Sequence, residues 1–179
     1  VQFVGAQGEL TGNTLVEGVT IRRYQISQST VSGVGEASNL ASSTPTDSGA
    51  AGGYQNGYLN IYIAPLTGGL LGQAYLGFPE CVVLTGSVGS VQSPGTAGNY
   101  SRGRTLTHEL GHNLGSGHWP GETGQSYAYG HRVDGNTDGD FTDSFDWGTV
   151  MSYNDISPDY FSNPNVSCKN GLACGVVNV

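Results

Sequence analysis

The sequence predicts one α+β domain in which a small β-sheet precedes a histidine-bearing helix and the C-terminal part is largely irregular. The chain has 179 residues, enough for one domain with a substantial core and too few for two comfortable ones. Apolar residues alternate over residues 58–64, as in a strand, and leucines recur every fourth residue over 101–114, as in a helix. We expect an upper part of about residues 1–115 and a lower part of about 116–179.

The N-terminal third predicts little regular structure. Residues 19–26 contain β-branched and aromatic side chains and predict a strand, whereas residues 28–57 are rich in Ser, Gly, Ala and Thr and predict a long surface loop. A short helix is expected within this loop, near Glu36–Ala41. No apolar stripe of a longer helix is evident.

The middle of the chain carries the clearest strand and helix patterns. Strands are expected at residues 58–64, 73–78 and 81–84. A helix is expected from Ser101, a suitable N-cap, to Leu114. Leu106, Leu110 and Leu114 would form the apolar stripe that this helix buries.

The composition excludes some classes of partner. Charged residues make up 11% of the chain, the net charge is −8, and only six residues are Lys or Arg. Nucleic acid is therefore not expected as a partner. Neutral polar groups supply the solubility, which is typical of secreted proteins, and no apolar run approaches the length of a membrane-spanning helix.

The three cysteines indicate an oxidising compartment. Cys168 and Cys174 bracket the sequence KNGLA, in which Asn-Gly can make a tight turn, so we expect a disulfide between them. Cys81 would then be an odd thiol, buried in a strand. The first residues lack an initiator methionine and a signal-peptide pattern, which indicates a mature chain.

Residues 108–118 spell H-E-x-x-H-x-x-G-x-x-H. On a helix, His108 and His112 stand four residues apart on one face, so their imidazoles can converge on one ion. Gly115 can take the left-handed conformation that lets the chain leave the helix sharply, and His118 can then return to the same ion. Zn²⁺ suits such nitrogen ligands.

This ligand set favours a catalytic metal. Three histidines leave the fourth position of zinc open, whereas structural zinc sites close all four positions, mostly with cysteine. Glu109 is too offset to join the pair of histidines easily, and its carboxylate is in the position of a general base. The alternative is a helix whose histidines merely lie on a polar face, and the length of the pattern argues against it.

A second candidate metal site lies in an acidic loop. Residues 134–143 have oxygen-bearing side chains at alternate positions and glycine at the sixth, as calcium loops do. The candidate Ca²⁺ ligands are Asp134, Asn136, Asp138, Asp140 and Asp143. The twelfth position is Phe145 where an EF-hand has glutamate. Two interpretations stay open: a calcium site, which would relieve carboxylate repulsion, and a solvated acidic loop.

The histidine pattern resembles the zinc-binding consensus of the metzincin metallopeptidases. The sequence TVMSY at 149–153 resembles the Met-turn of that family, whose methionine forms an apolar floor beneath the histidines, and Met151 is the only methionine in the chain. The resemblance gives Tyr153 the role of binding the zinc or the oxyanion of the reaction. The alternative for Tyr153 is an aromatic side chain packed beside the turn.

The resemblance covers about residues 57–165. It is pappalysin-like upstream of the zinc motif, at residues 58–64, 69–75 and 103–107. Downstream, residues 151–154 and 160–164 look more like secreted, reprolysin-like bacterial peptidases.

The resemblance implies a twisted mixed sheet whose antiparallel edge strand, around residues 71–76, lies above the active-site helix. Such an edge can bind an extended polypeptide as a further strand. The residues expected to bind substrate are Leu71, Gln73, Ala74 and Tyr75. Without the zinc motif, an ordinary edge strand would be the simpler interpretation. Metzincins also carry a long backing helix in the N-terminal half.

These features predict a secreted, monomeric zinc endopeptidase whose single catalytic domain spans the chain and whose pro-segment has been removed. Zinc would acidify a water molecule, Glu109 would take its proton, and Tyr153 would help to stabilise the oxyanion. One alternative is a zinc-containing binding or adhesion module without catalysis, and another is a hydrolase of non-peptide amides. The intact Glu109, with no cysteine near it in the sequence, argues against the first alternative.

Overall fold

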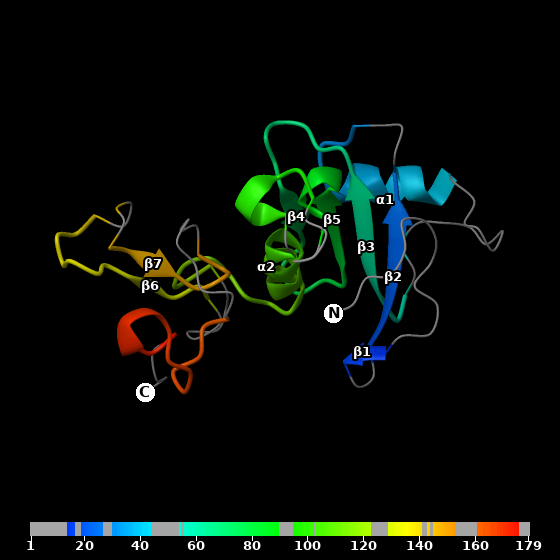
Figure 1. Ribbon diagram of the computed structural model, residues 1–179. Coiled ribbons are helices and arrows are strands. Elements are labelled where there is room, and N and C mark those ends of the chain that lie inside the picture. The colour runs from blue at the N-terminus through cyan, green and yellow to red at the C-terminus, as the bar shows by residue number, and fades with distance from the viewer. Residues whose placement is uncertain are drawn as a thin grey trace. The chain divides into compact units, whose positions relative to one another are not determined.

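The protein forms two compact units, Val1–Asn113 and Leu114–Val179. The computed structural model (Figure 1) describes residues 14–16, 19–26, 30–43, 54, 56–89, 95–101, 103–122, 129–140, 143, 145–152 and 161–175. That the two units act as a single catalytic domain stays a prediction.

The first unit is built on a five-stranded mixed sheet with the strand order β1-β2-β3-β5-β4 (Figure 1). The strands are β1 (Thr14–Val16), β2 (Val19–Gln25), β3 (Tyr58–Ala64), β4 (Gly72–Ala74) and β5 (Glu80–Leu84). β2, β3 and β5 are parallel, whereas β1 and β4 lie antiparallel at the two ends of the strand order. The mixed sheet with an antiparallel edge strand, expected from the resemblance, is therefore present.

Two helices pack on opposite faces of this sheet. They are α1 (Val34–Ser43) and α2 (Arg104–Asn113). Tyr62 of β3 packs in a buried cluster with Val34 of α1, whereas its neighbour Ile61 packs in a second cluster with Leu106 of α2. Because successive side chains of a strand point to opposite faces, each helix covers one face.

Helices α1 and α2 cover the two faces of the sheet, which explains why β3 is buried. The predicted bounds of β3 are confirmed. Every residue from Asn60 to Ala64 is buried. The polar atoms on this strand are paired: the Tyr62 hydroxyl donates to Ser38 Oγ of α1 at 3.1 Å, and the Asn60 amide donates to the Tyr58 carbonyl at 3.0 Å. These hydrogen bonds offset the free-energy cost of burying the polar groups.

Helix α1 is longer than the segment predicted near residues 36–41. The short helix expected there is therefore present, and Val34, Ala37 and Ala41 form a buried face that the sequence did not reveal. Alanine side chains are small and give a weak hydrophobic signal, although their spacing is helical. At the N-terminus, the Ser32 N–H and hydroxyl donate to Glu36 Oε2 at 2.8 and 2.7 Å, which helps to start the helix.

Helix α2 is shorter than the predicted helix over 101–114. Ser101 does not cap it, because this residue is buried and its hydroxyl donates to the Gly98 carbonyl at 2.7 Å, within a preceding 3₁₀ turn. Leu106 is buried as predicted, but Leu114 lies beyond the helix end and is 84% exposed. The 3₁₀ helices among the described residues are Thr85–Ser87, Gly98–Tyr100 and Lys169–Gly171.

The strand predicted over residues 73–78 ends at Ala74, because α2 holds the next residues in a turn. The Asn113 side-chain amide donates to the carbonyls of Phe78 and Glu80 at 2.7 and 2.8 Å. The Gly77 N–H donates to the His112 carbonyl at 2.8 Å. These bonds replace a strand ladder and fix the end of α2 to the β4–β5 connection.

The second unit has short strands and an irregular backbone, as predicted. Strands β6 (Arg132–Val133) and β7 (Trp147–Gly148) pair antiparallel. The predicted Cys168–Cys174 disulfide is present, with 5.1 Å between the two Cα atoms. In the first unit, Cys81 is a buried free thiol in β5, also as predicted, and burial raises its pKa. In the described part of the chain, neither α-helix is long and apolar enough to cross a bilayer.

Candidate metal centre

Helix α2 carries two of the three histidines of the motif. His108 and His112 stand one turn apart, with 4.8 Å between their ring centroids and an angle of 88° between the ring planes. The hydroxyl and the N–H of Thr107 in the first turn both bond to the Gly103 carbonyl, each at 2.9 Å. Because His108 and His112 are four residues apart on this helix, both imidazoles lie on one of its faces, as predicted.

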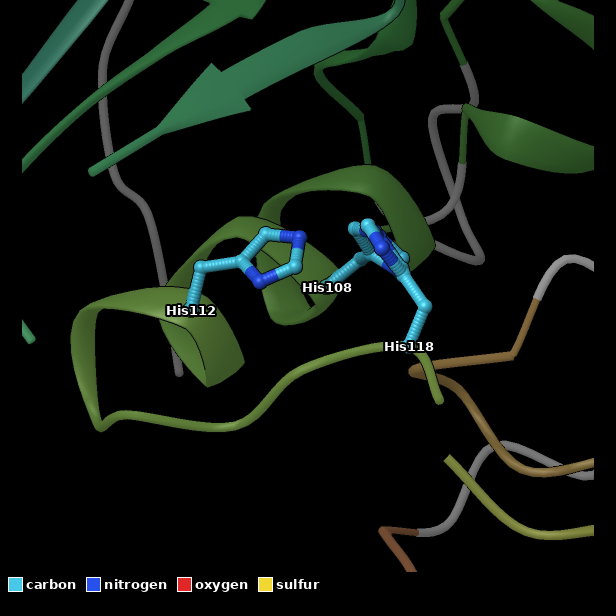
Figure 2. Close-up of side chains that lie close together, drawn as sticks. All are labelled: His108, His112 and His118. Atoms are coloured by element: carbon cyan, nitrogen blue, oxygen red, sulfur yellow. The ribbon is translucent and has the colours of Figure 1, made fainter. Parts of the chain in front are cut away.

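His118 joins these two rings from the segment that follows the helix. Gly115 has a φ of 90°, in the left-handed region that the sequence predicts for it. His108, His112 and His118 each offer one ligand nitrogen, and the three nitrogens all lie within 4.8 Å of one another. Figure 2 shows the three imidazoles gathered beside α2, with the ring of His112 directed toward the other two.

The donor set fits a zinc ion. Imidazole nitrogen is a preferred zinc ligand, and three neutral histidines form the ligand set of several catalytic zinc sites. Within the described ranges, these histidines are the only group of three or more His, Cys, Asp or Glu residues close enough to share a metal ion. All three are half-buried, so the group can be reached from solvent.

Glu109 lies on the same helix and is 5% exposed. Burial raises the pKa of its carboxyl to about 8 in the absence of a metal ion. A cation held by the adjacent histidines would favour the ionised form and counteract this shift. A carboxyl group in such an environment is suited to accept and release a proton near neutral pH.

Gly72 of β4 leaves the space that the Glu109 side chain fills. A Cβ atom on Gly72 would lie 2.4 Å from Glu109 Oε1 and 2.8 Å from its Cδ. Neither distance is compatible with van der Waals contact. Any side chain at position 72 must therefore displace the Glu109 carboxylate.

Replacing Gly72 with alanine is expected to lower kcat/KM for peptide hydrolysis by about 100-fold, since a shift of about 1 Å in a catalytic group can have this effect. Zinc content should not change, because the three atoms nearest this Cβ position all belong to Glu109, which is not a proposed ligand. Gly35→Ala is the matched control, since its Cβ would meet only the Tyr75 hydroxyl at 3.5 Å. Steady-state kinetics with metal analysis of both variants checks the prediction, and equal kcat/KM values would contradict it.

The residues expected to bind substrate lie on or beside β4 and have different surroundings. Among the described strands, β4 pairs only with β5. Gln73 is exposed, yet its side-chain oxygen accepts the Val34 N–H at the start of α1, at 3.0 Å. Leu71 and Ala74 are half-buried, and Tyr75 is 43% exposed. Gln73 therefore has a structural contact that the sequence did not predict, and substrate binding stays a prediction for all four residues.

Met151 lies in a tight turn of the second unit. The Ser152 N–H donates to the Thr149 carbonyl at 2.9 Å, and the Met151 side chain is fully buried. The turn is held from β6, since the His131 N–H donates to Thr149 Oγ1 at 2.9 Å. Tyr153, predicted to act at the reaction centre, lies outside the described residues.

The acidic loop connects β6 to β7 and is closed by its own side chains. Asp134 accepts the Gly139 N–H at 2.7 Å, and such backbone bonds hold the pKa of Asp134 below its usual range. The Asn136 amide donates to Asp138 and Asp143 at 2.9 and 2.8 Å. Asp140, the remaining candidate ligand, is exposed.

Asp146, which follows the five candidate calcium ligands, is fully buried at the base of the loop. Its carboxylate accepts the N–H groups of Gly135 and Asp143, both at 3.0 Å. The two ends of the loop are therefore joined by one carboxylate. The four aspartates among the candidate ligands do not form a group close enough to share a metal ion in the described structure. Calcium binding would require them to move closer together, and it stays a prediction.

Two residues near the histidines have roles that the sequence analysis missed. Asn113 fixes the end of α2 through its side-chain amide, as described above, and no local pattern predicts such long-range bonds. Glu122 contacts His118, with 3.3 Å between its Oε2 and His118 Nδ1. The Pro120-Gly121 pair before Glu122 is a turn signal that could have predicted this contact.

Part of the chain is similar in sequence to known metallopeptidases. No protein-family model matches the chain. An extracellular metalloprotease of Arthroderma otae is 44% identical over 80 residues, which cover 37% of this chain and 26% of that protein. The chain thus spans about a quarter of the length of this curated relative.

Two solved structures of mirolysin also show similarity. Mature mirolysin of Tannerella forsythia in complex with a cleaved peptide has 34% identity and a TM-score of 0.31, covering 40% of this chain and 29% of that chain. Mirolysin in complex with a small compound has 30% identity and a TM-score of 0.36, covering 59% of this chain and 38% of that chain. Both TM-scores are low, so no feature of this chain's site follows from mirolysin.

Proposed function

We propose that the chain is a secreted zinc endopeptidase of the metzincin type. The observation that carries the proposal is the convergence of three ligand nitrogens, from His108, His112 and His118, within 4.8 Å of one another. The sequence identity with an extracellular metalloprotease supports it. The disulfide of the second unit supports secretion, because such bonds persist in oxidising compartments.

The proposed chemistry assigns a role to each residue of the site. The three histidines hold zinc, which when bound supplies a Lewis acid that acidifies water and polarises a carbonyl group. Glu109 takes a proton from the attacking water and delivers it to the departing amine. From the resemblance to the metzincins, we assign Met151 to the apolar floor beneath the zinc ligands and the Tyr153 hydroxyl to the stabilisation of the oxyanion.

The substrate of the proposed reaction is an extended polypeptide. The outer edge of β4 offers backbone N–H and C=O groups to which a peptide can add as a further strand. Of the residues proposed to bind substrate, Gln73 and Ala74 belong to β4, and Leu71 and Tyr75 lie just before and just after it. Because backbone groups supply most of such binding, we expect the enzyme to accept many sequences.

The test is to incubate a library of unfolded proteins with the chain and to map the cut sites by mass spectrometry. Internal cuts that disappear with a zinc chelator and return with added zinc are the expected result. An adhesion module would bind zinc and cut nothing. A hydrolase of other amides would leave the proteins intact and hydrolyse small amides.

We also propose that the acidic loop binds calcium. Saturating Ca²⁺, at about 100 times its dissociation constant, is expected to stabilise the fold by about 2.7 kcal/mol, which raises Tm by roughly 5–10 °C in a protein of this size. Asp138→Asn combined with Asp140→Asn should abolish the increase. Differential scanning calorimetry at constant zinc, with and without Ca²⁺, measures it. An unchanged Tm for the wild type identifies the loop as a solvated acidic loop.

A further inference from the structure

The chain reverses direction directly after the third histidine. The Glu122 N–H donates to the Trp119 carbonyl at 3.3 Å, and Gly121 has a φ of 93°. Proline at the second position of a four-residue turn and a left-handed glycine at the third are the pattern of a type II turn. The sequence Trp-Pro-Gly-Glu therefore brings the side chain of Glu122 back toward His118.

One oxygen of Glu122 makes three contacts with this segment. Oε2 lies 3.3 Å from His118 Nδ1, accepts the backbone N–H of His118, and lies 3.4 Å from the backbone nitrogen of Trp119. The His118 side chain is 15% exposed and that of Glu122 is 36% exposed, so the contact is partly shielded from water. The Arg132 guanidinium lies over the Trp119 ring, 5.1 Å from the ring centroid.

A neutral imidazole carries one proton, and the nitrogen that donates a hydrogen bond cannot also bind a metal. An acceptor at Nδ1 keeps the proton there and leaves Nε2 as the ligand atom. A carboxylate in this position also fixes the ring orientation and makes the ligand more basic. The histidine motif alone does not predict this carboxylate partner of His118, because Glu122 lies four residues beyond the motif.

We propose that Glu122 is a positioning residue for the metal centre: its carboxylate accepts the Nδ1 proton of His118 and so presents Nε2 to the ion. The proposal rests on the proposed function, because it requires that His118 be a zinc ligand. In this arrangement the Pro-Gly turn sets the distance between the Glu122 carboxylate and the His118 ring. Glu122 contacts neither substrate nor the reacting atoms in this role.

The alternative is that Glu122 only closes the turn by accepting backbone N–H groups. Glu36 offers a matched control for this role, because its Oε2 accepts the backbone N–H of a residue four positions earlier, Ser32, at 2.8 Å. Glu36→Ala and Glu122→Ala remove the same kind of backbone contact. They differ in that the Glu122 contact includes an imidazole.

The experiment measures zinc affinity by competition with a chromophoric chelator for the wild type, Glu122→Ala, Glu122→Gln and Glu36→Ala. We expect Glu122→Ala to weaken zinc binding by about 10- to 100-fold, the usual effect of losing an outer partner of a ligand. Glu122→Gln keeps an acceptor oxygen and should fall between Glu122→Ala and the wild type. Glu36→Ala should bind zinc as the wild type does. Equal affinities for all four proteins would overturn the inference.

A second readout needs no variant. Long-range ¹H–¹⁵N spectra of the zinc-loaded wild type, with ¹⁵N-labelled histidine, report which nitrogen of His118 carries the proton. The proton is expected on Nδ1, and a proton on Nε2 overturns the inference even if Glu122→Ala fails to fold. Wild-type protein that binds no zinc would overturn the proposed function together with the inference, whereas zinc binding with either contrary result overturns the inference alone.

Discussion

Replacing Glu109 with glutamine is expected to lower kcat for peptide hydrolysis by about 10²- to 10⁴-fold, the usual contribution of a general base, while zinc remains bound. Glutamine has nearly the same shape as glutamate, so it fits the space beside Gly72, but it cannot take a proton from water. The measurements are steady-state kinetics on an unfolded protein substrate and metal analysis of the same preparation.

Glu80→Gln is the control for the loss of one partly buried carboxyl group. Glu80 lies on β5, and burial raises its pKa as it does that of Glu109. This variant should keep the kcat of the wild type, because it removes no interaction that is made only in the transition state. Cleavage by Glu109→Gln at the wild-type rate would remove Glu109 from the mechanism.

The second large effect is expected for His112→Ala, which removes one of the three proposed ligands. Zinc affinity should fall by more than about 100-fold, because the loss of even an outer partner of a ligand reaches that value. Peptide hydrolysis should fall with the bound zinc. Equilibrium dialysis against buffered zinc, followed by activity measurements on the same samples, tests both effects.

His131 provides the matched control, since it is the fourth histidine of the chain and lies outside the group that can share a metal. Its ring lies 6.0 Å from that of Trp147. His131→Ala should keep the zinc affinity of the wild type. If His131→Ala and His112→Ala lose zinc equally, the ligand assignment is wrong.

The features that the sequence predicted well depend on contacts between near neighbours in the chain. The spacing of His108 and His112 is a property of any helix, and the left-handed Gly115 follows from the need to turn sharply. The bounds of β3 and the disulfide between Cys168 and Cys174 also follow from local patterns. In each case the sequence within about ten residues contains the information.

The features that it missed depend on contacts between distant segments. The strand predicted over 73–78 is cut short by hydrogen bonds from Asn113, and Gln73 bonds to the start of α1. The buried face of α1 consists of small side chains whose packing partners lie on β3 and β5. No single-sequence pattern contains these pairings, because the register of the sheet decides them.

The proposed function depends most on which atoms bind the zinc ion. X-ray absorption spectroscopy at the zinc edge identifies these atoms most directly. The wild-type protein, loaded with one equivalent of zinc, should show three histidine nitrogens and one solvent oxygen at about 2.0–2.2 Å. Glu109→Gln should give the same spectrum, because Glu109 is not a ligand. A sulfur ligand at about 2.3 Å, or a fourth imidazole in the shell, would contradict the account.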